Sequence, residues 1–300
     1  MSHAPAGGDR DAESICPVGV VHSTAGQDTG VSPLRQTMKP FGSGRDDGAL
    51  YHPGDAVKYL LGDSFHPGGL RLTEELASLL SLSPATTVLD VASGKGTTAF
   101  FLAEKFRCRV IGIDLSEQNI LDATTEAAAR GLSDLATFRL ADAEGLPFDA
   151  GVFDAIVCEC AFCTFPSKQT AAAEFERVLK PGGRVGISDI TKDGTSLPEL
   201  DGLLAWIACI GDAQPLEKYA AWLAATGLRI THSEHKSHYL QEMVQDIRGK
   251  LLMAEIMIGL KKLRLPGLDI QQAKSFATAA NDAIRDKKLG YALLIAQKPV

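Results

Sequence analysis

Short apolar runs alternate with amphipathic stretches through the middle of this chain, and this alternation constrains the fold more than any other feature. Short apolar runs between turn residues are typical of buried strands, and apolar residues three or four apart are typical of helices. The pattern predicts βαβ units with right-handed crossovers, and therefore an α/β fold with a doubly wound, mostly parallel sheet. The expected strands are 88–91, 110–113, 136–140, 155–157, 185–187, 229–232 and 291–296, and the expected helices beside them are 97–106, 117–130, 170–179 and 216–225.

The flanking segments divide the chain into four parts. Residues 1–48 are rich in Gly, Ser, Asp and Pro without an apolar period, which predicts a disordered tail. Residues 49–83 are predicted to form N-terminal helices at 53–61 and 72–82, separated by a Pro-Gly-Gly breaker. The α/β core is expected at 84–236. Residues 237–300 are expected to hold a helical lid beside the substrate pocket and the closing strand.

Composition narrows the classes of function. The 300 residues are 45% hydrophobic and carry a formal net charge of -7 without a dense basic stripe, so nucleic acid is not an expected partner. No run approaches the ~18 apolar residues of a membrane span, and the amino terminus lacks a signal-peptide pattern. The chain is therefore predicted to be cytoplasmic, with its six cysteines present as thiols.

A glycine-rich turn follows the first predicted strand and opens a helix. It reads Asp90-Val-Ala-Ser93-Gly94-Lys-Gly96. Glycines let the backbone approach a ligand closely, and the helix amino terminus directs its N–H groups toward that ligand. The turn is therefore predicted to bind a cofactor.

Acidic residues follow the next strands at the same predicted edge. Asp114 ends the second strand about 20 residues past the glycines, where a carboxylate accepts both hydroxyls of a ribose. Asp142 follows the third strand, where it can meet the exocyclic amine of adenine. Their neighbours Leu115 and Ala143 complete this set of predicted cofactor contacts.

With these acids in this order, residues 86–235 resemble the class I S-adenosylmethionine methyltransferases. The resemblance implies a Rossmann-like methyltransferase fold and S-adenosyl-L-methionine as the cofactor, with Glu159 approaching its methionine amine. A nicotinamide enzyme is the alternative for the same fold, but its Gly-x-Gly-x-x-Gly fingerprint requires glycine where this chain has Ala99.

Cysteines gather where the fourth strand is expected to end. Strand alternation places Cys158 and Cys160 on one face, with Cys160 nearer the carboxyl edge, and Cys163 follows. Cys209 lies after the fifth strand on the same predicted rim. Thiolates are soft ligands that suit a thiophilic centre.

These contexts resemble the arsenite methyltransferases. In that family one cysteine precedes a short loop ending in lysine, as Cys160 precedes Lys168, and another lies in a Cys-x-Gly-x-Ala segment, as Cys209 does here. The resemblance implies that Cys160 and Cys209 are the catalytic residues and hold trivalent arsenic with its lone pair toward the donor methyl. Alignment would then supply most of the catalysis.

The third arsenic ligand is open among Cys163, Cys16 and an added thiol such as glutathione. One alternative function is methylation of an amine, carbon or hydroxyl of an ordinary small metabolite, with the cysteines as packing. Another is a non-catalytic domain that binds the cofactor as a sensor or scaffold. The chain lacks the paired Cys-x-x-Cys of structural zinc, so no resident metal is predicted.

Overall fold

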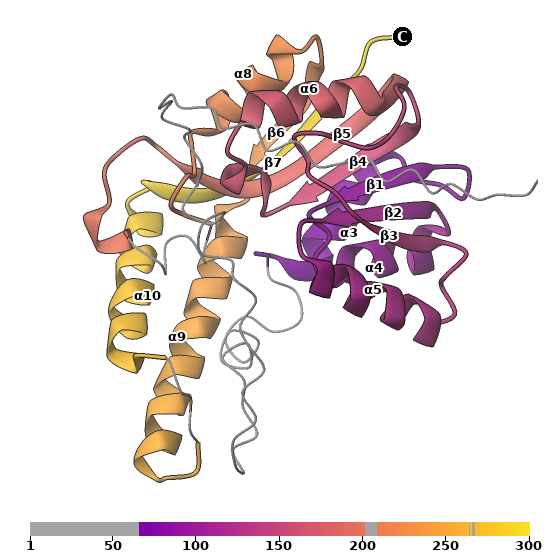
Figure 1. Cartoon of the computed structure of the whole chain (residues 1–300). Helices are drawn as coiled ribbons and strands as arrows, with labels where there is room; N and C mark the ends of the chain where they lie inside the picture. The colour runs from indigo at the N-terminus through magenta and orange to yellow at the C-terminus, as the bar shows by residue number, and fades with distance from the viewer. Residues whose placement is uncertain (1–65, 202–208, 264, 266–267) are drawn as a thin grey trace, which may run out of the picture.

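The computed structural model describes residues 66–201, 209–263, 265 and 268–300. Within these residues the sheet has seven strands in the order β3-β2-β1-β4-β5-β7-β6 (Figure 1). Only β7 runs antiparallel to its neighbours, so the predicted mostly parallel α/β sheet is confirmed. The strands are β1 Thr87–Val91, β2 Arg109–Asp114, β3 Ala136–Leu140, β4 Phe153–Glu159, β5 Leu179–Lys192, β6 Arg229–His235 and β7 Leu289–Gln297.

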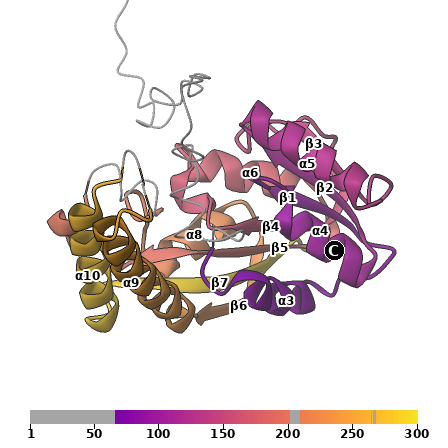
Figure 2. The same ribbon diagram turned by 90° about the horizontal axis from the view of Figure 1, so that it is seen from below.

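Helices cover both faces of the sheet. In Figures 1 and 2, α3, α4 and α5 lie on one face, and α6 and α8 lie on the other. Each face has its own apolar core, because buried side chains of α3 and α4 pack in one cluster and those of α6 and α8 in a second. These helices are α3 Gly69–Leu80, α4 Thr97–Phe106, α5 Glu117–Ala129, α6 Lys168–Val178 and α8 Leu216–Ala225, with short 3-10 turns η1 Phe162–Thr164 and η2 Pro198–Leu200.

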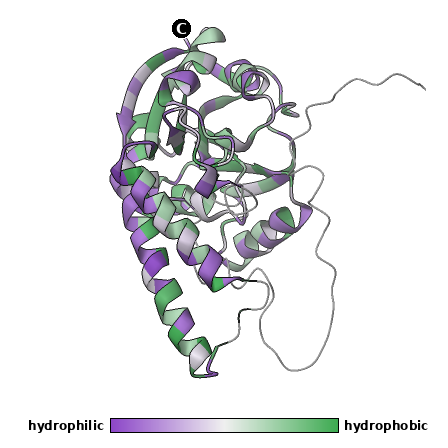
Figure 3. Cartoon of the chain, turned by 90° about the vertical axis from the view of Figure 1, so that its left-hand side faces the viewer, coloured by the Kyte–Doolittle hydropathy of each residue, from purple (hydrophilic) through white to green (hydrophobic). Residues whose placement is uncertain are grey.

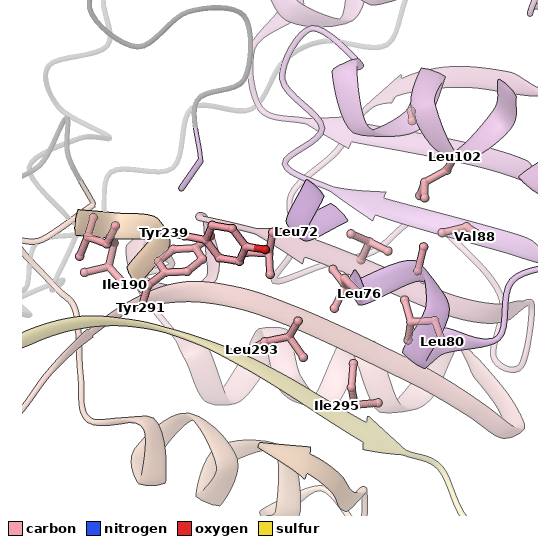
Figure 4. Close-up of a cluster of buried hydrophobic side chains, with 14 of the residues drawn as sticks. Leu72, Leu76, Leu80, Val88, Leu102, Ile190, Tyr239, Tyr291, Leu293 and Ile295 are labelled. Carbon is pink, nitrogen blue, oxygen red and sulfur yellow. The ribbon is translucent and has the colours of Figure 1, made fainter. Parts of the chain in front are cut away.

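The first core joins α3 to the last strands of the sheet. Figure 4 shows Leu72, Leu76 and Leu80 of α3 beside Leu293 and Ile295 of β7. All five side chains are at most 5% exposed, and burying a leucine or isoleucine stabilises the fold by about 1.5–3 kcal/mol. This packing fixes α3 against the sheet and places its amino terminus near the carboxyl ends of the parallel strands.

Two helices are inserted between β6 and β7, within the segment 237–300 that was predicted to be helical before a closing strand. They are α9 Ser237–Gly259 and α10 Ile270–Arg285, which lie side by side and project from the sheet (Figures 1 and 2). Green and purple residues alternate along both helices in Figure 3, so neither is apolar all round. No helix in the part of the chain described here is long and apolar enough to span a bilayer.

The boundaries differ from prediction around the fifth strand. The expected helix at 170–179 ends at Val178, and β5 already begins at Leu179, before the Pro-Gly-Gly sequence. Leu179 pairs with Phe153, and the register then shifts before Ala155. Gly182 at φ 78° lets the strand continue through this irregularity, which a pattern of apolar runs does not reveal. The predicted tail at 1–48 and helix at 53–61 lie outside the described residues.

Candidate active site

The turn between β1 and α4 is held against the end of β2. The N–H of Ser93 donates to the Ile113 carbonyl at 2.8 Å, and that of Gly96 donates to the Ser93 carbonyl at 2.9 Å. Ala92, Gly94 and Gly96 all adopt left-handed φ values of 58°, 54° and 85°. Ala92 is the only one of the three with a Cβ, so it carries the conformational cost that glycine avoids.

The two glycines of this turn have different surroundings. A Cβ on Gly96 would lie 2.7 Å from Cζ of Phe138 and 2.9 Å from Cζ of Phe100. A Cβ on Gly94 would meet no protein atom within 4 Å. Packing therefore requires glycine at position 96, whereas the space beside Gly94 is open to a ligand.

The acids predicted after β2 and β3 lie at one edge. The carboxylate of Asp114 accepts hydrogen bonds from the N–H groups of Gly94 (2.9 Å) and Ser116 (2.8 Å). The Asp114 carbonyl accepts from the N–H of Ala141, one residue before Asp142. Leu115 beside it is 62% exposed, a large apolar side chain presented at this edge, whereas Ala143 is buried.

Asp90 is buried at the end of β1 with an unsatisfied oxygen. Its Oδ2 and the Oγ of Ser93 have no hydrogen-bond partner among the described residues. Burial raises the pKa of Asp90 well above its ordinary value, and the nearby carboxylates of Glu159 and Asp114 raise it further. A buried carboxylate with a free acceptor is a feature of sites that receive a cationic or hydrogen-bond-donating ligand.

Glu159, at the end of β4, lies in a network of hydroxyl groups. Its side chain is 4% exposed and accepts hydrogen bonds from Thr98 (2.8 Å) and Thr73 (3.0 Å). Nε2 of His66 lies 3.6 Å from the carboxylate without a hydrogen-bond partner of its own in the described chain. These three partners were not predicted from the sequence, because a lone threonine or histidine on a helix or turn belongs to no motif.

Three of the predicted thiols meet across the carboxyl end of β4. The Cys209 thiol donates to the carbonyl of Cys160 at 3.3 Å, and the Cys163 thiol donates to the carbonyl of Cys209 at 3.2 Å. Cys160 and Cys209 both adopt left-handed backbone conformations, at φ 51° and 60°. Such strain in non-glycine residues is enriched at functional sites.

The prediction that Cys158 and Cys160 share a face is wrong. The strand ends at Glu159, and the left-handed Cys160 turns out of it, so strand alternation stops there. Cys158 packs in the core beneath α6 and α8, whereas Cys160 packs against the opposite core. Cys158 shares its core with Cys163, but among the described residues it makes no hydrogen bond to the three-thiol group.

The three thiols titrate as a group. Hydrogen bonds from Cys160 and Cys163 hold the pKa of Cys209 well below its ordinary value. The hydrogen bond to Cys209 and burial raise the pKa of Cys160, and burial raises that of Cys163. One thiolate is thus readily formed in the group, while further deprotonation is resisted. Among the described residues, no group of three or more His, Cys, Asp or Glu side chains is arranged to hold a metal ion.

Asp189 of β5 anchors the loop that carries Cys163. Its Oδ2 accepts a hydrogen bond from the N–H of Cys163 at 2.8 Å, and its side chain is fully buried. Asp189 was not predicted as a site residue, although a Ser-Asp pair inside an apolar run indicates buried polar groups that need partners. Lys168 has a similar structural role, because its Nζ donates to the Phe165 carbonyl at 3.0 Å.

The stability of the protein is expected to fall as the pH rises from about 4 to about 7. Burial, and then the charge of Cys209, raise the pKa of Asp189 from 3.8 to about 7. Between these values the folded state binds more protons than the unfolded state, so raising the pH favours unfolding. Asp189→Asn should flatten the pH dependence of the free energy of unfolding, measured by urea denaturation from pH 5 to pH 8. An unchanged slope would contradict this assignment.

Comparison with known proteins identifies the family. A model described as a methyltransferase domain matches residues 82–247. Methyltransferase GfsG of Streptomyces halstedii is 30% identical over 240 residues, which cover 79% of this chain and 83% of that protein. The 27-O-demethylrifamycin SV methyltransferase of Amycolatopsis mediterranei is 26% identical over 287 residues, covering 88% and 99%.

A solved structure shares the fold. Phosphoethanolamine N-methyltransferase 2 of Haemonchus contortus, in complex with S-adenosyl-L-methionine, aligns with a TM-score of 0.68 at 20% identity, over 82% of this chain and 56% of that one. The names of these three proteins do not refer to arsenite, so they support the broader resemblance and not the arsenite resemblance. The chain belongs to the methyltransferase-domain family and is an S-adenosylmethionine-dependent methyltransferase.

Proposed function

We propose that this methyltransferase transfers methyl groups to trivalent arsenic, supplied as arsenite, or to a similar soft metalloid bound by Cys160 and Cys209. The observation that carries the proposal is the contact between these two residues, which lie 49 positions apart in the chain and meet at the end of β4. Cys160 directly follows Glu159, whose carboxylate reaches Thr98 in the first turn of α4. Cys160 therefore directly follows a residue whose side chain contacts the helix that the glycine-rich turn opens.

The residues around that turn fit S-adenosyl-L-methionine. The buried carboxylates of Asp90 and Glu159 suit the ammonium of the methionine part, because a cation there relieves their mutual repulsion. Asp114 suits the ribose hydroxyls and Asp142 the adenine amine. The open side of the turn and the exposed apolar side chain beside Asp114 suit the remaining atoms of the cofactor; the residues concerned are Ser93, Gly94, Gly96, Leu115 and Ala143.

The proposed reaction places few acid–base demands on the protein. The bound cofactor supplies an activated methyl group on a sulfonium. The arsenic lone pair forms the new As–C bond, and the electrons of the breaking C–S bond remain on sulfur, so no proton has to be removed from the nucleophile. Cys160 and Cys209 act by fixing the arsenic and directing its lone pair, a contribution of proximity and alignment.

The second candidate is methyl transfer to oxygen or nitrogen of a small metabolite. The names of the relatives favour it, since one refers to a rifamycin O-methylation position and another to phosphoethanolamine. In that case the thiols contribute packing alone, and α9 and α10 provide a wall of the acceptor pocket.

Serine substitution separates the two candidates. Cys160→Ser and Cys209→Ser are each expected to lower the rate of arsenite methylation at least about 100-fold, because an alcohol is a poor ligand for a thiophilic centre. Methylated arsenic would be quantified by chromatography with mass spectrometry, in the presence of S-adenosylmethionine and glutathione. Calorimetric titration should show unchanged cofactor affinity in both variants.

Cys108→Ser is the matched control. Its thiol is buried and donates to the Leu102 carbonyl, remote from the three-thiol group. This variant should methylate arsenite at the rate of the natural protein. If the Cys160 and Cys209 variants do so as well, or if the natural protein does not methylate arsenite, the metalloid proposal fails and small metabolites become the acceptors to test.

A further inference from the structure

We infer that Cys163 is the third ligand of the metalloid, so that this site holds trivalent arsenic on three protein thiolates without an added thiol. The inference rests on the proposed function and deepens it. Two thiolates leave one arsenic valence to a hydroxide or to an external thiol such as glutathione. A third protein thiolate makes the site selective for trivalent, thiophilic centres.

The position of Cys163 carries the inference. Its thiol donates to the backbone carbonyl of Cys209, and the Cys209 thiol in turn donates to the carbonyl of Cys160. The buried carboxylate of Asp189 accepts a hydrogen bond from the N–H of Cys163 and so holds the turn η1, which bears Cys163, in position. In the described chain the three cysteine side chains are not yet arranged to hold one ion together. Rotation of these short side chains therefore has to bring the three sulfurs around the arsenic.

Charge favours a trivalent centre at this place. Two acidic side chains are buried beside the thiols: Asp189 accepts a hydrogen bond from the N–H of Cys163, and Glu159, which precedes Cys160, has a side chain that is 4% exposed. Three thiolates on As(III) form a neutral complex, which a low-dielectric site tolerates. Three thiolates on Zn²⁺ would leave a net negative charge beside the same carboxylates, which the site disfavours.

Loading of the site needs no oxidant or reductant. Arsenous acid carries three hydroxides, and each cysteine replaces one of them. Each thiol proton leaves with one hydroxide as water, so three waters are released and the oxidation state of arsenic does not change. A site with two cysteines would release two waters and keep one hydroxide on arsenic.

Native mass spectrometry of the full chain with arsenite, without glutathione, counts these waters directly. The natural protein is expected to give a complex that has lost three waters, and Cys163→Ser a complex that has lost two. Cys163→Ser should also bind arsenite at least about tenfold more weakly, a loss that glutathione restores by supplying the missing thiol. Cys163→Ala provides a second variant with the same expected outcome.

Two variants serve as controls. Cys158→Ser replaces an equally buried cysteine of the same core, and Cys16→Ser tests the remaining candidate for the third ligand. Both should behave as the natural protein. A natural complex that loses only two waters, or a Cys163→Ser variant with unchanged affinity, overturns the role of Cys163 while the proposal for Cys160 and Cys209 stands. Failure of the natural protein to bind arsenite removes the proposed function as well.

Discussion

Asp90→Asn is expected to weaken the binding of S-adenosylmethionine about 10- to 100-fold. In the proposed complex the methionine ammonium donates a charge-assisted hydrogen bond to this carboxylate; such a bond contributes about 1.5–3 kcal/mol, and each 1.4 kcal/mol corresponds to a factor of ten in affinity. The asparagine keeps an oxygen for the N–H of Ala99, which now donates to Asp90. Calorimetric titration with the cofactor measures the loss.

The same substitution should raise the melting temperature of the cofactor-free protein. Burial and the charges of Glu159 and Asp114 raise the pKa of Asp90, so the folded state holds its carboxylate at a cost that grows as the pH rises above about 4. A neutral amide removes this cost. A gain in stability together with a loss of affinity is the signature of a residue retained for function.

Asp154→Asn is the control at the opposite end of β4. Its carboxylate accepts hydrogen bonds from the N–H of Thr87 and from Lys180, both at the amino edge of the sheet. We expect a loss of about 1 kcal/mol in stability, because the pair is partly exposed, and no change in cofactor affinity. If Asp90→Asn instead lowered stability and left cofactor affinity unchanged, Asp90 would be a structural residue.

Alanine at the two turn glycines should separate packing from cofactor binding. Gly96→Ala is expected to lower the free energy of unfolding by about 2–4 kcal/mol, from about 1–2 for the left-handed backbone and the rest for displacing the Phe138 and Phe100 rings. Gly94→Ala bears the backbone cost alone, about 1–2 kcal/mol. Urea denaturation of the two variants measures the difference.

Cofactor titration of Gly94→Ala completes the test. Its Cβ enters open space at the side of the turn proposed to face the ligand, so cofactor affinity should fall although the fold is nearly intact. An unchanged affinity would show that this space lies away from the cofactor. Equal stability losses in the two variants would contradict the packing argument for Gly96.

Local patterns were sufficient to predict the sheet and the positions of its acids. The apolar runs at 88–91 and 110–113 form β1 and β2 almost as predicted, and Asp114 ends β2. Parallel strands present their carboxyl ends at one edge, so a residue that ends such a strand is placed there by the topology alone. The resemblance to the class I methyltransferases rested on these same residues.

Other parts of the candidate site depend on contacts between distant segments. The partners of Glu159 come from α3 and α4, and Asp189 supports Cys163 from β5, 26 residues away. The failed prediction for Cys158 and Cys160 shows the limit of local rules, because Cys160 adopts a left-handed conformation directly after the strand and packs against the other core.

The sequence by itself determined the α/β class, the cofactor turn and the set of candidate thiols, because periodicity and glycine spacing are local properties of the chain. Only the tertiary structure decided that Cys163 joins Cys160 and Cys209, that Cys158 does not, and that Asp90 keeps an unsatisfied oxygen. Burial, desolvation and the meeting of thiols 46 and 49 residues apart are set by how the elements pack, and no short stretch of sequence encodes them.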